Sequence, residues 1–341
     1  MTELADTLNV TGSFPVAPGN ITHGPGGRIF LSLHQFYNPD VCVCELVDGH
    51  LKPFPSGPGS SLIRFEAVLG IQADANGWVW MLDNGSQNKK LPKLVAWDTA
   101  KDRLAQVIYL PEPITTSGSF VNDLAIDLTR KVIYISDPVQ GLTAAIIRVD
   151  LETGLATRIL QGHESVIPQN IDLIIKGVPV QIKRPDGTLF RPHLGVNGIV
   201  IDAKNEWVYF CPMHGTSMYR AKSSDLANAD LGEQELAERV ERYSDRPICD
   251  GISIDNDNNL YLGDLAAFGI GVIKPDRSYE LLITDERLSW VDSFSFGPDH
   301  CLYFNCDKLQ LSAPLNAGKD ESNPPYNIFQ MKALSPGVVG H

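Results

Sequence analysis

The sequence predicts an all-β fold, a single six-bladed β-propeller domain that spans residues 1–341. Three observations lead to this prediction. One short motif recurs six times, each copy contains short β-rich runs separated by turn residues, and the copies begin 42 to 75 residues apart. Repeats of this size, each with several short strands, are typical of propeller blades.

The repeat opens on a polar residue, alternates apolar positions, reaches an acidic or turn residue five positions on, and continues into an aromatic-rich strand. The clearest copies are Asn122–Asp127 before Val132–Asp137, Asn197–Asp202 before Trp207–Phe210, and Asp250–Asp255 before Leu260–Asp264. Weaker copies are Asn20–Pro25 before Arg28–Ser32, Leu69–Asp74 before Trp78–Asp83, and Asp292–Gly297 before Cys301–Asn305. A single copy cannot bury both faces of its strands, whereas radial stacking buries them and leaves only short edges.

Three segments outside the repeat also carry predictions. Asp230–Tyr243 is rich in Glu, Leu, Ala and Arg and indicates a helix or a helical loop. Residues 163–193 form a long insertion, in which Val178–Lys183 and the turn Arg184–Gly187 predict a hairpin that projects over one face as a lid. Asn323–Met331 is expected to be the last strand of the chain.

A propeller closes when a strand from one terminus completes a blade begun at the other. Either the N-terminal run Leu8–Phe14 or the C-terminal run can do this, and the sequence does not choose between them.

Composition narrows the classes of partner. The formal net charge is −13, with 28 basic and 41 acidic residues. This balance repels nucleic-acid phosphates and anionic lipid, so we expect a small-molecule substrate or ligand and neither nucleic acid nor membrane as partner. The acidic balance suits a cation-binding site, although a solvated acidic surface is the commoner explanation. Nothing in the sequence indicates an oligomeric state.

A cytoplasmic location is expected. Met1–Val10 lacks the basic and apolar regions of a signal peptide, and no run approaches the roughly 18 apolar residues that span a bilayer. The six cysteines are scattered and read as reduced thiols. Cys42 and Cys44 point to the same face of one strand, and no second pair completes a zinc site.

The first residue of each repeat is expected at the mouth of the central channel, because the innermost strand of a propeller blade lines that channel. In chain order these residues are Asn20, Leu69, Asn122, Asn197, Asp250 and Asp292. Oxygen donors that converge from separate blades are what Ca²⁺ prefers, and the lack of Cys or His at this position argues against zinc or copper. The alternative is that Asn-Gly and Asp-Gly serve only as turns where strands begin.

Four runs resemble the yellow/major royal jelly protein family, especially its bacterial members, which are dopachrome tautomerase-related. They are Gly70–Asp83, Pro92–Asp98, Val208–Tyr219 and Pro325–Phe329. The resemblance extends over nearly the whole chain. It implies a propeller, with an activity that ranges across the family from isomerase-type enzymes to ligand-binding proteins.

The repeat also resembles the wider group of calcium-dependent propellers, which includes gluconolactonase (senescence marker protein-like) and paraoxonase. Their ligands are Glu, Asn, Asn and Asp from blades one, three, four and five, and here Asn122, Asn197 and Asp250 match the last three. Asn20 stands in place of the glutamate, which removes one negative charge; Asp292 and Glu66 are nearby carboxylates that can replace it. This resemblance implies one Ca²⁺ in the channel, held by Asn20, Asn122, Asn197 and Asp250.

If Ca²⁺ is bound, the expected reaction is hydrolysis of a lactone or ester, in which the metal polarises the carbonyl and a carboxylate activates water. Asp292 is the leading candidate for the general base, with Asp123 and Glu66 as alternatives. His23 and His214 are candidates for acid–base chemistry, although a lone histidine is commonly structural.

Glu66, Leu69 and His34 are expected to contact the substrate, with simple packing as the alternative for Leu69. Two other functions use the same ring. One is a dopachrome-type tautomerase or isomerase that employs the ring as a proton relay. The other is a non-enzymatic binding protein, in which the lid at residues 163–193 encloses a small molecule.

Overall fold

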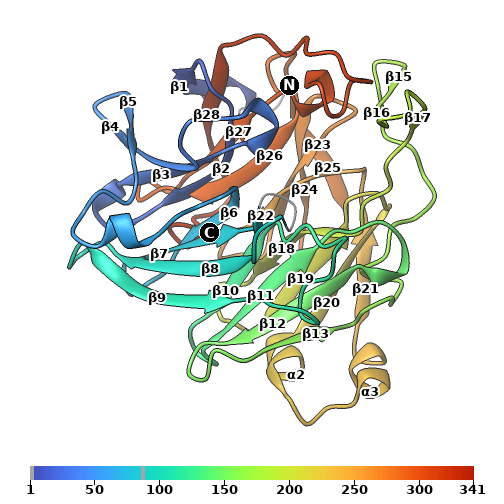
Figure 1. The fold of residues 1–341 in the computed structure, drawn as a ribbon. Helices are drawn as coiled ribbons and strands as arrows, with labels where there is room; N and C mark the ends of the chain where they lie inside the picture. Colours follow the sequence, from blue (N-terminus) through green and yellow to red (C-terminus); the bar gives the residue numbers. More distant parts are fainter. Residues whose placement is uncertain (1–3, 86–88) are drawn as a thin grey trace.

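In the computed structural model, which describes residues 4–85 and 89–341, six four-stranded antiparallel sheets surround a central channel (Figure 1). The innermost strands contact one another in a closed ring, in the order β2, β6, β10, β18, β22, β26 and back to β2. The predicted all-β six-bladed propeller is confirmed.

The six sheets define the blades. Blade 1 contains β2 (Pro18–His23), β3 (Ile29–Leu33), β4 (Val43–Val47) and β5 (His50–Pro53); blade 2 contains β6 (Val68–Ala73), β7 (Trp78–Asp83), β8 (Lys93–Asp98) and β9 (Arg103–Tyr109). Blade 3 contains β10 (Leu124–Asp127), β11 (Val132–Asp137), β12 (Ala145–Asp150) and β13 (Ala156–Ile159); blade 4 contains β18 (Val196–Ile201), β19 (Trp207–Pro212), β20 (Ser217–Lys222) and β21 (Glu241–Asp245). Blade 5 contains β22 (Ile252–Ile254), β23 (Leu260–Asp264), β24 (Gly269–Ile273) and β25 (Tyr279–Thr284).

Blade 6 contains strands from both ends of the chain and closes the ring of blades. It contains β26 (Val291–Phe296), β27 (Cys301–Cys306) and β28 (Tyr326–Lys332), and its outermost strand is β1 (Asn9–Phe14) from the N-terminus. β1 pairs antiparallel with β28, with Val10 opposite Phe329 and Phe14 opposite Tyr326. The predicted C-terminal strand is therefore present, and the N-terminal strand closes the propeller.

The core lies between the blades. Tyr134 of blade 3 and Phe210 of blade 4 belong to one buried apolar cluster, and Trp80 of blade 2 shares another with Ile135 of blade 3. Since each interface buries alternate residues of two facing sheets, the apolar alternation in the repeat becomes the hydrophobic core.

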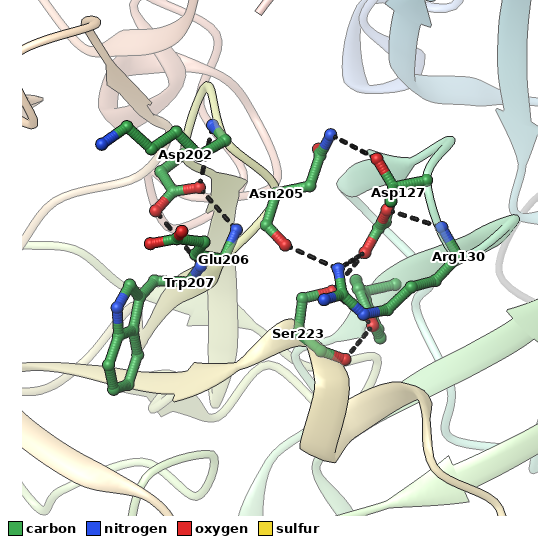
Figure 2. Close-up of polar contacts among 10 residues, drawn as sticks. Asp127, Arg130, Asp202, Asn205, Glu206, Trp207 and Ser223 are labelled. Carbon is green, nitrogen blue, oxygen red and sulfur yellow. Dashed lines mark hydrogen bonds and ion pairs between the residues drawn. The ribbon is translucent and has the colours of Figure 1, made fainter.

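The acidic residue five positions into the repeat holds a tight turn at the far end of the inner strand. The carboxylate of Asp202 accepts hydrogen bonds from the backbone amides of Lys204, Glu206 and Trp207 (Figure 2). Asp74 and Asp255 cap the equivalent turns in blades 2 and 5 in the same way. These repeated aspartates are therefore structural.

Asp127 adds a link between blades 3 and 4. Its carboxylate accepts hydrogen bonds from the Arg130 guanidinium at 2.9 Å and from the Ser223 hydroxyl (Figure 2). The same guanidinium donates to the backbone carbonyl of Asn205 at 2.7 Å. Hydrogen bonds thus connect the two neighbouring turns. These turns lie at the end of the propeller opposite to the first residues of the repeats.

Helical structure is sparse among the described residues. Two α-helices, α2 (Ser223–Ala227) and α3 (Glu233–Ala237), lie between β20 and β21. The 3-10 turns are Ala5–Thr7, Pro25–Gly27, Gln35–Tyr37, Ser60–Leu62, Gly141–Thr143 and Leu309–Leu311. The helix predicted over Asp230–Tyr243 is wrong in extent, because its last residues pair with β20 as part of β21. Sheet pairing here overrides helix propensity.

The insertion between blades 3 and 4 contains two small hairpins rather than the one that was predicted. β14 (Ile174–Ile175) pairs with β15 (Val178–Pro179), and β16 (Ile182–Lys183) pairs with β17 (Leu189–Phe190). Val178 therefore belongs to the first hairpin, and the turn Arg184–Gly187 joins the strands of the second.

The C-terminus lies at the centre of the ring of blades (Figure 1). The backbone amide of Phe296 donates to the carbonyl of His341 at 2.8 Å, and the Thr22 hydroxyl donates to the carbonyl of Gly340 at 2.9 Å. Gly340 has φ +92°, and a Cβ there would meet the His23 carbonyl oxygen at 2.7 Å, so a glycine is required. The chain end thus lies across the channel where the inner strands end. No helix that the structure describes is long and apolar enough to cross a membrane.

Candidate functional site

A cavity of about 510 Å³ opens at the end of the propeller where the inner strands begin. Its lining includes five of the six residues predicted for the ring, which come from blades 2 to 6: Leu69, Asn122, Asn197, Asp250 and Asp292. The structure therefore brings these five side chains together.

A β-bulge at the start of the inner strand explains why Leu69, Asn197 and Asp292 face the cavity, whereas Asn122 and Asp250 lie just before their strands begin. Strand pairing shifts register at the same place in blades 2, 4 and 6, between Val68 and Ile71, Val196 and Ile199, and Val291 and Phe294. The bulged residues include Leu69, Asn197 and Asp292. A bulge leaves a residue outside the regular ladder and re-aims its side chain.

The predicted position of Asn20 requires a correction. In blade 1 the register shift lies between Pro18 and Asn20, so Gly19 occupies the ring position and contributes no side chain. Asn20 lies one residue deeper, in a second cavity of about 30 Å³ that Asp123 also lines. A shift of one residue changes the face and depth of every side chain in a strand.

Three ring residues form a chain of hydrogen bonds across blades 3, 4 and 5. The side-chain amide of Asn122 donates to Asn197 Oδ1, and the amide of Asn197 donates to Asp250 Oδ1. The indole of Trp290 donates to Asp250 Oδ2 at 2.8 Å. Each carboxylate oxygen of Asp250 therefore accepts a hydrogen bond, and the two bonds fix the orientation of the carboxylate.

Asp292 lies between two further carboxyl groups, those of Asp250 and Asp307, and interacts with both. Burial raises the pKa of Asp250 to about 6. Burial and the neighbouring carboxylates raise the pKa values of Asp292 and Asp307 well above the usual range, with burial the larger cause. Within the described part of the chain, none of these three groups forms an ion pair with a basic side chain.

Asp123 is a fourth carboxylate near the propeller axis. Its pKa is raised to about 7, mainly by burial and also by the charge of Asp250, while hydrogen bonds from the Leu124 amide and Asn20 act in the opposite direction. Because it lines the deeper cavity instead of the main one, Asp123 is not placed to contact a molecule bound above the ring.

Two buried histidines line the main cavity from blades on opposite sides of the ring. Backbone amides donate to Nδ1 of His34 at 3.2 Å, from Phe36, and to Nδ1 of His214 at 3.0 Å, from Leu194. Each neutral ring therefore carries its proton on Nε2. Burial lowers the pKa of His34 to about 3 and that of His214 to about 4, so both stay neutral near pH 7.

The environments of the two Nε2 atoms differ. His34 belongs to a cluster in which one ring nitrogen and carboxylate oxygens of Asp292 and Asp307 all lie within 4.8 Å of one another. His214 Nε2 is buried and has no hydrogen-bond partner in the described protein. It is buried away from the open cavity, with less than 1 Å² of exposed surface, and the His214 ring packs against His193 with the ring centroids 5.6 Å apart.

Two predicted site residues lie elsewhere. His23 is at the opposite end of β2, where its Nδ1 lies 3.1 Å from the Ser295 hydroxyl and its ring packs on Tyr303. Glu66 pairs with Arg64 at 3.2 Å and does not line the cavity. His23 therefore does not lie where its expected catalytic role requires. Glu66 does not lie where it could contact a substrate in this cavity.

Asp307 and Trp290 are site residues that the sequence reasoning missed. Asp307 follows the second strand of blade 6, which is the position that His34 occupies in blade 1. Aligning the ends of the second strands, as well as the starts of the first, would have found it. Its two carboxylate oxygens are buried without a well-aligned hydrogen-bond donor, and its nearest polar groups are the Asp292 carboxyl and the Leu309 amide.

Comparisons with known proteins agree with this architecture. The family described as "Major royal jelly protein" matches residues 66–288. A search of curated proteins found no match. Among solved structures, a luciferin-regenerating enzyme has 12% identity and a TM-score of 0.61, and covers 98% of this chain and 97% of its own.

Two further structures have the same fold. The calcium-binding protein regucalcin from Agrobacterium tumefaciens has 12% identity and a TM-score of 0.58, with 97% of each chain covered. Virginiamycin B lyase from Staphylococcus aureus has 13% identity and a TM-score of 0.55, and covers 96% of this chain and 99% of its own. At such identities the likeness shows the fold alone.

Proposed function

This chain belongs to the major royal jelly protein family. Because the family resemblance includes both enzymes and binding proteins, the function of this chain has to be argued from its site. We propose that it is a Ca²⁺-dependent hydrolase of a small lactone or ester, acting at the mouth of the central channel. The proposed metal ligands are Asn122, Asn197 and Asp250. Asp292 lies beside them and supplies the negative charge that is missing where Asn20 replaces a glutamate.

One observation carries the proposal: the buried carboxyl groups of Asp250 and Asp307 and the partly buried one of Asp292 face one another without a basic partner among the described residues. Buried charges of one sign repel strongly at low dielectric and must be neutralised by protons or by a cation. The amide oxygens of Asn122 and Asn197 supply the neutral donors that Ca²⁺ also takes. The donor set therefore fits a hard divalent cation.

Ca²⁺ bound there would polarise the substrate carbonyl as a Lewis acid. Asp292 is the proposed general base, because it is partly exposed to the cavity and interacts with two other carboxyl groups. It takes a proton from the attacking water as the oxygen of that water bonds to the carbonyl carbon. The same proton then passes to the leaving oxygen as the carbon–oxygen bond breaks, which yields an alcohol and an acid.

The other residues orient the reactants. Trp290 fixes the Asp250 carboxylate through its indole N–H. His34 holds a neutral ring beside Asp292 and Asp307, and His214 packs in the cavity lining with its Nε2 buried. Neither histidine is expected to act as a base near neutral pH, because burial lowers both pKa values.

A dopachrome-type tautomerase is the second candidate, favoured by the raised pKa values of the same carboxyl groups. A cluster that keeps protons at neutral pH can move a proton between two positions of a substrate without a metal. A non-enzymatic binding protein is the third outcome that the experiments distinguish.

The test is a panel of lactones, esters and dopachrome, assayed on EDTA-treated protein before and after Ca²⁺ is restored. We expect lactone or ester turnover only with Ca²⁺, and its loss in Asp250→Asn. Asp276→Asn, in an exposed turn, is the matched control and should behave like the unmodified protein. Undiminished hydrolysis in EDTA would contradict the metal mechanism. Dopachrome turnover without metal would favour the tautomerase, and binding without any turnover would favour the binding protein.

A further inference from the structure

The wall of the main cavity differs in chemistry from its floor. Above the ring, the lining is a buried apolar cluster built from the insertion, blade 4 and the loops of blades 5 and 6. Its members at the cavity are Leu173, Val180, Ile182, Leu194, Met213, Trp290, Leu309 and Leu315. A molecule whose reacting end reaches the ring must therefore place the rest of its body against apolar side chains.

The described lining of the cavity has no basic side chain to offer an anion. No Lys or Arg lines it in the described part of the chain, and its ionisable lining groups are Asp250, Asp292 and the two neutral histidines. Arg246 is buried near the floor, but its guanidinium donates to the carbonyls of Pro212, Pro247 and Ser217 and to the Cys249 thiol. A phosphate or carboxylate on the substrate would meet no cationic side chain.

The wall also offers few partners for hydroxyl groups. Its polar side chains lie on one side, at Ser117, Ser119, Gln140 and Thr143, and the Ser119 hydroxyl already donates to Asp137 at 2.7 Å. His214 Nε2 lacks a partner in the described protein, but it is buried and presents no surface to the cavity. Buried hydroxyls that find no partner are unfavourable, so a polyhydroxylated molecule fits this wall poorly.

We propose that the substrate is an uncharged molecule with an apolar alkyl or aryl body and one carbonyl group at its reacting end. Sugar lactones, and substrates with a phosphate or carboxylate on the body that lies against the wall, are disfavoured because the wall is apolar and its described part contains no basic side chain. The inference rests on the proposed function for the reaction but not for binding, so the two can be tested separately. The cavity volume is in the usual range for ligands of this size.

Binding is measured first, with a compound that cannot be hydrolysed. A cyclohexanone that carries an alkyl chain is titrated into the protein by calorimetry, and Trp290 in the wall provides a fluorescence signal. Each added methylene should tighten binding about fourfold until the chain outgrows the cavity. The same ketone with a terminal carboxylate should bind at least tenfold more weakly.

Turnover is compared next, using δ-lactones with alkyl chains of increasing length, the same lactones with a terminal carboxylate, and glucono-δ-lactone. The alkyl lactones should have the highest kcat/KM. A preference for glucono-δ-lactone or for the carboxylated lactones would overturn the substrate class while leaving the hydrolase intact. Ketone binding that follows the predicted series without any lactone turnover would instead overturn the proposed reaction and leave the substrate class standing.

Substitutions at Val178, in the first hairpin of the insertion, and at Val180, just after it, test which side chains form the apolar wall. Val180→Lys places a charge in the buried cluster and should weaken alkyl ketone binding at least tenfold, while it strengthens binding of the carboxylated ketone. Val180→Thr keeps the shape and should weaken alkyl binding by a smaller factor, which covers the case in which the lysine variant fails to fold. Val178→Lys is the control, since Val178 is 63% exposed and does not line the cavity. Equal effects of Val178→Lys and Val180→Lys would overturn the assignment of the wall.

Discussion

Aspartates lie at both ends of the inner strands, and their hydrogen bonding differs. At the far end, Asp202 and Asp255 accept several hydrogen bonds each, from backbone amides and neighbouring side chains. At the cavity end, Asp292 and Asp307 face other carboxyl groups, and Asp307 has no well-aligned donor. A carboxylate saturated by amides stabilises a turn, whereas carboxylates left with only one another form a site that needs a proton or a cation.

The strongest way to break this comparison is to neutralise one aspartate at each end. Asp250→Asn should lower Ca²⁺ affinity about 100-fold or more, because the site loses a charge in direct contact with the cation. It should not lower the Tm of the metal-free protein, because a repulsive charge is removed. Calorimetric titration and thermal unfolding measure the two effects.

Asp202→Asn, the matched substitution at the far end of the inner strands, should lower stability and leave Ca²⁺ binding unchanged. Asp202→Asn weakens three hydrogen bonds to backbone amides, and the expected loss is about 1–3 kcal/mol of unfolding free energy. Ca²⁺ affinity and turnover per folded molecule should be unchanged. If Asp202→Asn abolished Ca²⁺ binding while the fold stayed intact, the division between the two ends would be wrong.

The pH dependence of Ca²⁺ stabilisation sharpens the comparison. Folded-state pKa values of about 6 for Asp250 and about 7 for Asp123 lie above the unfolded values near 4. Their contribution to the stability of the metal-free protein is therefore fully present below pH 4 and is lost as the pH rises through 6 to 7. Ca²⁺ binds the ionised groups, so the rise in Tm on adding Ca²⁺ should grow between pH 5 and pH 8. A rise that is constant over this range would contradict the carboxylate assignment.

Activity should follow the same groups and not the histidines. At limiting Ca²⁺, kcat/KM should rise through pH 6 to 7, and its midpoint should fall as Ca²⁺ is increased, since protons and the cation compete. His214→Gln should not move the midpoint, because burial lowers the pKa of His214 to about 4 and keeps its ring neutral over this range. A shifted midpoint in this variant would assign the titration to His214.

The smallest expected effect concerns Asn20. Because it lies one residue below the ring, Asn20→Ala should change Ca²⁺ affinity less than about threefold, whereas Asn122→Ala should weaken it by about tenfold or more. Equal losses in the two variants would restore Asn20 to the ligand set.

The repeat was sufficient to predict the fold and the convergence of five ring residues, because apolar alternation and turn residues are local signals. The depth of Asn20 could not be predicted, since it depends on where a bulge falls in a strand that gives no sequence sign of it. Asp307 escaped for a different reason: it reaches the site from the end of a second strand, a position at which the six blades carry unlike residues. The short extent of α3 was also unpredictable from local propensity, since pairing with β20 determines where β21 begins.

The central claim is that the cavity-end carboxylates form a cation site. Calorimetric titration of EDTA-treated protein with CaCl₂ at pH 7.5 tests it most directly. We expect one Ca²⁺-binding site, which is lost in Asp250→Asn and retained in Asp202→Asn. Absence of binding heat, together with an unchanged Tm at millimolar Ca²⁺, would contradict it.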